Sequence, residues 1–185
     1  MSDNAVKIAV LVGSLRAASV NRELAEIALE NLPEGVQASI VDGLGGIAFY
    51  NEDVDTPETL PAGVAELRAA VVDADAVLLV TPEYNGTLPA VLKNAIDWLS
   101  RPYGAGAFVG KPIGVIGAAL GQYGGVWSRE DTRKSVGIAG GRVIEDIEIG
   151  VATGKLDAAG VRTEAIVEQV ADAVRVLAGS VAVSV

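Results

Sequence analysis

The sequence predicts an α/β fold in which five parallel strands, in the order 2-1-3-4-5, form a sheet between two layers of helices. Short apolar runs rich in Val, Ile and Ala alternate along the 185 residues with longer segments whose apolar positions recur at helical spacing. This alternation is typical of βαβ units with right-handed crossovers. Half of the residues are hydrophobic and 22 are glycine. We expect one domain over residues 1–185, a length that can bury a full core.

Five segments have the character of strands. The first is a β-branched run closed by Gly13. In chain order, the predicted strands are Lys7–Val12, Gln37–Val41, Ala76–Val80, Pro112–Gly117 and Arg142–Ile149. Because dinucleotide-binding sheets usually have six strands and a longer chain, five strands favour the order 2-1-3-4-5.

Helices are predicted between these strands. In the first, Leu24, Ile27, Ala28 and Leu32 share one face, and Pro33 follows. The predicted helices are Asn21–Leu32, Pro61–Asp73, Ala90–Ser100, Trp127–Val136 and Thr163–Leu177. The apolar face of 90–100, which includes Trp98, predicts core packing. The charges of 127–136, from Arg129 to Lys134, indicate a mixed-charge surface.

The composition excludes several kinds of chemistry. The chain has no cysteine and no histidine, so it cannot form a Cys/His zinc site, a thiolate nucleophile or a Ser-His-Asp triad. The formal net charge of −10 disfavours nucleic acid and anionic membrane surfaces as partners. The N-terminus lacks the pattern of a signal peptide, which predicts a cytoplasmic protein. An enzyme of this composition is expected to rely on an organic cofactor or a carboxylate-bound metal.

The strand order predicts where a ligand binds. In open parallel sheets, ligands bind beyond the carboxyl ends of the strands, where the winding direction reverses. For the order 2-1-3-4-5 this point lies between strands 1 and 3. The loops after Val12, Val80 and Gly117 are therefore expected to form one site.

The first of these loops, Gly13–Asn21, has the residues of a phosphate site. Ser14, Ser19 and Asn21 offer short polar side chains, Arg16 offers a guanidinium, and the following helix offers free N–H groups. The loop is not a Walker A motif. An ordinary capped turn between strand and helix remains the alternative.

The other two loops are suited to a flat ligand. Two prolines and an Asn-Gly pair stiffen the stretch 81–89, where Tyr84 adds a ring and Asn85 an amide. The stretch 117–125 is rich in glycine, which lets backbone approach a ligand closely. A structural turn and a flexible connector are the respective alternatives.

Four carboxylates near the end of strand 2 are candidate magnesium ligands. The candidates are Asp42, Glu52, Asp53 and Asp55. The three converging loops contain no Asp, so a solvated acidic loop is the preferred interpretation and no metal site is predicted.

Three motifs together resemble the NADPH-dependent FMN reductase family over residues 5–145. They are Gly13-Ser14-Leu15-Arg16 with Ser19 and Asn21, then Pro82-Glu83-Tyr84-Asn85, then the stretch 92–102, LKNAIDWLSRP. The resemblance implies a flavodoxin-like three-layer sandwich that binds FMN. It places the FMN phosphate at Ser14, Arg16, Ser19 and Asn21. It places the isoalloxazine ring at Pro82, Glu83, Tyr84, Asn85, Gly86, Ala118, Gly121 and Gly124.

The implied activity is NAD(P)H-dependent reduction. Hydride passes from NADPH or NADH to N5 of bound FMN, and the electrons pass on to a small acceptor: a quinone, free flavin, an azo dye or a metal oxyanion. No side chain is expected to act as a catalytic acid or base. Relatives suggest a homodimer or homotetramer, in which Trp98 would contact a second subunit as the alternative to core packing. An Arg101–Glu83 ion pair near the flavin, within or between subunits, is a further hypothesis. The alternative is a flavodoxin-type electron carrier, although aromatic residues are scarce here at 4%.

Overall fold

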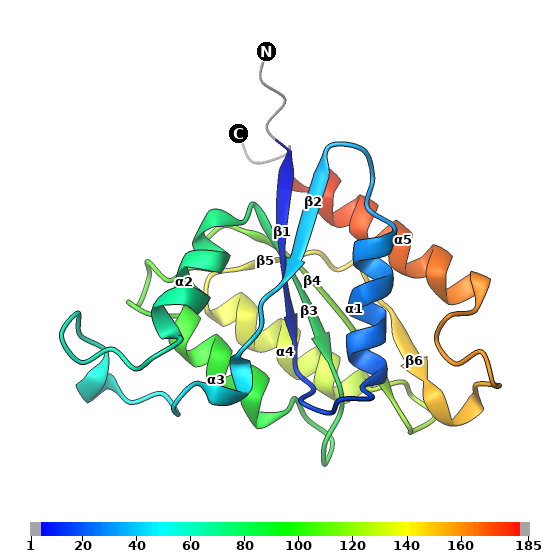
Figure 1. Cartoon of the computed structure of the whole chain (residues 1–185), viewed down its shortest axis with the longest axis horizontal. Helices are drawn as coiled ribbons and strands as arrows, with labels where there is room; N and C mark the ends of the chain where they lie inside the picture. Colours follow the sequence, from blue (N-terminus) through cyan, green and yellow to red (C-terminus); the bar gives the residue numbers. More distant parts are fainter. Residues whose placement is uncertain (1–4, 182–185) are drawn as a thin grey trace.

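A parallel sheet forms the centre of the computed structural model, which describes residues 5–181 (Figure 1). Its strands are β1 (Val6–Val12), β2 (Val36–Ile40), β3 (Ala76–Thr81), β4 (Pro112–Ala119), β5 (Arg142–Val143) and β6 (Gly150–Ala152). The order β2-β1-β3-β4-β5 confirms the predicted topology, and β6 also pairs with β4. The apolar tail 179–185, for which the sequence predicts no role, lies mostly outside the described residues.

Helices cover both faces of the sheet. They are α1 (Val20–Glu30), α2 (Val64–Asp73), α3 (Ala90–Leu99), α4 (Val126–Ile138) and α5 (Glu164–Gly179), with short 3-10 turns η1 (Leu44–Gly46), η2 (Glu52–Val54) and η3 (Thr153–Lys155). Figure 1 shows α1 and α5 on one face, and α2, α3 and α4 on the other. Each predicted helix is present with slightly shifted ends. The shift at the start of α2 follows from Gly63, whose φ of 82° is not helical.

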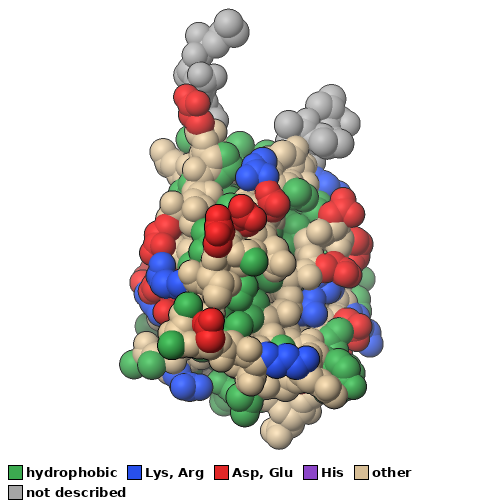
Figure 2. Space-filling view, turned by 90° about the vertical axis from the view of Figure 1, so that its right-hand side faces the viewer, with side chains coloured by type: hydrophobic (Ala, Val, Ile, Leu, Met, Phe, Trp, Pro, Cys, Tyr) green, Lys and Arg blue, Asp and Glu red, His purple; other side chains and the backbone are tan. Residues whose placement is uncertain are grey.

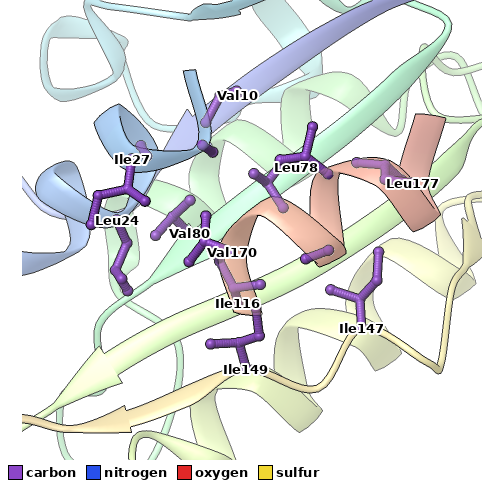
Figure 3. Packing of buried hydrophobic residues seen from close by; sticks show 14 of the residues in the cluster. Val10, Leu24, Ile27, Leu78, Val80, Ile116, Ile147, Ile149, Val170 and Leu177 are labelled. Carbon is purple, nitrogen blue, oxygen red and sulfur yellow. The ribbon is translucent and has the colours of Figure 1, made fainter. Parts of the chain in front are cut away.

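The first apolar layer lies between the sheet and the pair α1–α5. Figure 3 shows Val10, Val80 and Ile116 of the sheet facing helix residues such as Leu24 and Leu177. Burying one such aliphatic side chain contributes about 1.5–3 kcal/mol. Each residue of β3 is buried, as expected for a central strand covered on both faces.

The second apolar layer lies under α2, α3 and α4. Trp98 of α3 is fully buried there, and its indole Nε1–H donates to the Ala48 carbonyl at 2.8 Å. Its ring meets Tyr50 edge to face, with centroids 4.8 Å apart. Trp98 therefore packs in the core of its own chain, and the alternative of a contact across a subunit boundary is wrong.

The predicted fifth strand, 142–149, is wrong as a continuous element. Arg142 pairs with Pro112, but Gly150 pairs with Gly117, so three extra residues lie between β5 and β6. In this interruption Ile147 points into the core and fills the space that Gly114 leaves on β4. A Cβ at Gly114 would stand 3.0 Å from the Ile147 side chain.

Arg133 of α4 stabilises this interruption. Its Nη2 donates to the Ile147 carbonyl at 2.5 Å and lies 3.5 Å from the Val115 carbonyl. Val115 lies on β4 between its pairs with β5 and β6, and Ile147 lies in the interruption between β5 and β6. A side chain of α4 therefore supplies a donor that a continuous strand would have supplied.

Acidic and basic side chains are interspersed on the face that Figure 2 shows. Among the ion pairs of the molecule is a cluster in which Arg162 lies between Glu23, Glu26 and Glu30 of α1. Within residues 5–181, no helix is long and apolar enough to cross a membrane.

Candidate functional site

Strand pairing brings the ends of β1, β3 and β4 to one level. Val12 pairs with Val80, and Val80 pairs with Ile116. Beyond this level the Gly13 N–H donates to the Val80 carbonyl at 2.9 Å. The loops 13–19, 82–89 and 120–125 therefore leave the sheet at the same edge, which is the lower edge in Figure 1. The strand order predicts this convergence.

The first loop ends at a capped helix. The Ser19 hydroxyl accepts a hydrogen bond from Arg22 N–H at 3.2 Å and is the N-cap of α1. Ser14 is half-buried, while the Arg16 side chain is exposed and has no hydrogen bond or ion pair to any described residue. The start of the 11-residue α1 adds backbone donors and a partial positive charge. Ser14 and Arg16 are thus available to an anion, whereas the Ser19 hydroxyl also serves α1.

Asn21 has a different environment. It is 5% exposed, and its Nδ2 donates to the Ala118 carbonyl while its Oδ1 accepts from the Ala118 N–H, both at 2.9 Å. Its side chain is therefore bonded to the end of β4 and not directed to the first loop.

The second loop contains a tight two-residue turn. Asn85 and Gly86 both have positive φ, at 52° and 76°, as in a type I′ turn. Tyr84 and Thr87 exchange two backbone hydrogen bonds across it, of 3.1 and 3.2 Å. The turn holds Tyr84 at the surface, 47% exposed. The residues predicted to contact a flat ring therefore lie on a small rigid hairpin.

Buried polar contacts join this hairpin to α4. The Ser128 hydroxyl donates to the Pro82 carbonyl and shares a hydrogen bond with Thr81, both at 2.7 Å. The Ser128 N–H donates to the Glu83 carboxylate at 3.2 Å. Glu83 thus lies at the positive end of α4. Ser128 is not among the predicted site residues, because a serine in a predicted surface helix gives no signal of burial.

The third loop requires glycine at its base. A Cβ at Gly117 would stand 2.3 Å from the Thr81 carbonyl oxygen, and one at Gly124 would stand 2.4 Å from the Gly150 carbonyl oxygen. Gly124 also has a φ of 56°. By contrast, a Cβ at Gly121 would meet no atom within 4 Å. Gly117 and Gly124 bring the strand ends together, and Gly121 lies in the open part of the loop.

The polar residues of the motif on α3 hold the long connection after β2. Asn94 accepts from Tyr50 N–H at 2.8 Å and donates to the Ala48 carbonyl at 3.0 Å. Arg101 lies over the Tyr50 ring, 5.4 Å from its centroid, and donates to its hydroxyl. Arg101 therefore has Tyr50 as its partner within the chain. The expected ion pair with Glu83 is not formed within the described part of this chain, so its intrachain form is wrong.

Arg129 corrects the prediction of a mixed-charge surface on α4. It is only 8% exposed, and its Nε has no hydrogen-bond partner. Its guanidinium lies against Gly150, where an added Cβ would stand 2.4 Å from Nη2. Burial, and then the neighbouring charge of Arg133, lower the pKa of Arg129. A buried cation therefore lies behind the Gly124–Gly150 contact.

Two of the four candidate carboxylates after β2, Asp42 and Asp55, form ion pairs. Asp55 receives two hydrogen bonds of 2.8 Å from Arg68, which lower its pKa. Asp42 pairs with Arg22 at 3.2 Å. Within the described part of the chain, no group of three or more acidic residues is arranged to hold a metal ion.

The geometry suits a ligand with an anionic end and a flat end. An exposed guanidinium and a helix start lie at one side, and a rigid hairpin and a glycine loop lie beside them. FMN has this shape, with its phosphate at one end and its ring at the other. The fold is that of a flavodoxin-like protein, and the carboxyl ends of β1, β3 and β4 are its candidate nucleotide site.

Comparison with known proteins identifies the family. The family profile described as NADPH-dependent FMN reductase matches residues 6–155, and the chain belongs to this family. A 2-hydroxy-1,4-benzoquinone reductase of a Burkholderia species is 43% identical over 120 residues, which are 65% of this chain and 64% of that protein. A quinone reductase of Pseudomonas putida is 43% identical over 129 residues, 70% of this chain and 68% of its own length. The matched stretches therefore span about two thirds of these relatives.

A solved structure agrees over nearly the whole chain. FerB from Paracoccus denitrificans, described as a flavoenzyme NAD(P)H:(acceptor) oxidoreductase, superposes with a TM-score of 0.81 at 29% identity, and covers 96% of this chain and 97% of its own.

Proposed function

We propose that this chain is an NAD(P)H-dependent FMN oxidoreductase that passes electrons to a small acceptor such as a quinone. The observation that carries this proposal is the convergence of the three loops at the level of the Val12–Val80–Ile116 register. Family membership and the quinone reductases among the relatives support it. We further propose that residues 1–185 act as one FMN-binding domain.

The residues of the chain bind and orient the cofactor. Ser14, Arg16 and the start of α1 at Ser19 would hold its phosphate. The hairpin 82–86, with Ala118, Gly121 and Gly124, would hold its ring. When bound, FMN would supply the chemistry of accepting a hydride from NAD(P)H and passing electrons to the acceptor. The protein therefore needs no acid–base side chain, which is consistent with a chain that has no histidine.

We also propose an oligomeric state and a location. A homodimer or homotetramer is proposed from the resemblance to the family, and exposed apolar residues such as Ile138, at 75%, are available for a contact. A cytoplasmic location is inferred because the reaction consumes a pyridine nucleotide.

The test is a spectrum, a titration and a steady-state assay. The purified protein is expected to bind FMN with a flavin absorption band, and to oxidise NADPH or NADH when a quinone is added. Arg16→Ala removes a charge-assisted contact, so it should weaken FMN binding about tenfold or more but leave riboflavin binding unchanged. FMN binding without NAD(P)H oxidation would instead indicate the electron carrier, and a protein that takes up no flavin would refute the proposal.

A further inference from the structure

Asn21 is the residue whose place in the structure departs most from its expected role. Its side chain is buried, and both of its polar atoms are bonded to the backbone of Ala118, 97 residues further along the chain. Asn21 belongs to the first turn of α1, directly after the first loop. Ala118 lies near the end of β4, directly before the third loop. One side chain thus connects the two loops proposed to hold opposite ends of the cofactor.

The end of β3 explains why this connection is needed. β3 ends at Thr81, and the next residue, Pro82, has no N–H with which to continue a ladder. Beyond that point β4 runs on to Ala119, past the last register pair with β3, Thr81–Gly117. The amide of Asn21 gives Ala118 one donor and one acceptor, as an adjacent strand does.

Resting on the proposed function, we infer that Asn21 is a positioning residue for the flavin ring and does not bind the phosphate. It fixes Ala118, and with it the start of the glycine loop, relative to the start of α1. Both of its polar atoms are engaged with Ala118. Loss of Asn21 therefore displaces the surface that receives the ring, while Ser14 and Arg16 remain available to the phosphate.

The experiment compares FMN with riboflavin, which lacks the phosphate. Asn21→Leu keeps the branched shape and the number of heavy atoms and removes both hydrogen bonds. Asn21→Leu is expected to weaken FMN and riboflavin binding by the same factor, about tenfold to a hundredfold. Arg16→Ala is the comparison, because it should weaken only FMN binding. Asn31→Ala is the matched control: Asn31 bonds Ile27 at the far end of the same helix, and its loss should leave both affinities unchanged.

The outcomes separate the alternatives. If Asn21→Leu weakens only FMN binding, Asn21 is a phosphate ligand and the inference is wrong. If the folded variant binds both flavins normally, Asn21 has only a structural role and the inference is wrong as well. If the wild-type chain binds neither flavin, the proposed function itself fails.

A second measurement requires no variant. The Ala118 N–H in wild-type protein should be protected from hydrogen exchange, because it donates to a buried side chain. Rapid exchange of this amide in the flavin-free protein would show that the Asn21–Ala118 bond does not persist, and would overturn the inference even if Asn21→Leu failed to fold.

Discussion

Removal of Arg68 is predicted to destabilise the fold strongly. Arg68 of α2 donates two hydrogen bonds of 2.8 Å to Asp55, and its Nε and Nη2 donate to the Trp98 carbonyl at 3.2 and 3.0 Å. The side chains of Arg68 and Asp55 are only 23% and 13% exposed, so water screens this pair weakly. With about 1 kcal/mol for each bond to the carbonyl and about 1.5–3 kcal/mol for the charged pair, Arg68→Ala should lower the free energy of unfolding by about 3–5 kcal/mol.

The assay is urea unfolding of Arg68→Ala, Asp55→Asn and the double variant. Because the two side chains contact each other, the coupling energy of this cycle should be about 1.5–3 kcal/mol. A loss below about 1 kcal/mol for Arg68→Ala, or single-variant effects that simply add, would refute the reasoning.

The same pair predicts a dependence on pH. The hydrogen bonds from Arg68 hold the pKa of Asp55 below its ordinary value of 3.8, so the folded chain binds this proton less readily than the unfolded chain. The stabilisation is present above the unfolded pKa and is lost as the pH falls through the lower, folded value. Between neutral pH and acid, wild-type protein should therefore lose more stability than Asp55→Asn. Equal losses would contradict this prediction.

Three further predictions concern the third loop, the hairpin and the core. Gly124→Ala should cost about 3 kcal/mol or more, because its Cβ would overlap the Gly150 carbonyl at a positive φ, whereas Gly121→Ala should change the melting temperature little. Ser128→Ala removes two buried hydrogen bonds under the hairpin, so it should cost about 2 kcal/mol in urea unfolding and weaken flavin binding; normal flavin binding would show that the hairpin holds its place without them. Trp98→Phe removes the indole donor to the Ala48 carbonyl, which keeps its bond from Asn94, and leaves a void in a fully buried position. It should cost about 1.5–3 kcal/mol, and a smaller loss in thermal unfolding would contradict this prediction.

Much of the fold could be predicted because its signals are local. The β-branched run before Gly13 and the fully apolar segment 76–80 are buried strands, as their composition indicates. The number of strands then selects the sheet order, and the sheet order places the loops after Val12, Val80 and Gly117 together. The family motif extends this to a cofactor, because it specifies loop chemistry that periodicity alone leaves open.

By itself, the sequence determined the layers, the strand order and the edge at which the loops meet. Only the tertiary structure decided how individual polar side chains are used. Asn21 bonds Ala118, 97 positions away, and Ile147 enters the core because Gly114 leaves room for it. Arginine is usually found at the protein surface, but Arg129 is buried against Gly150. These partners lie on other elements, so neither hydrophobic periodicity nor local propensity carries information about them.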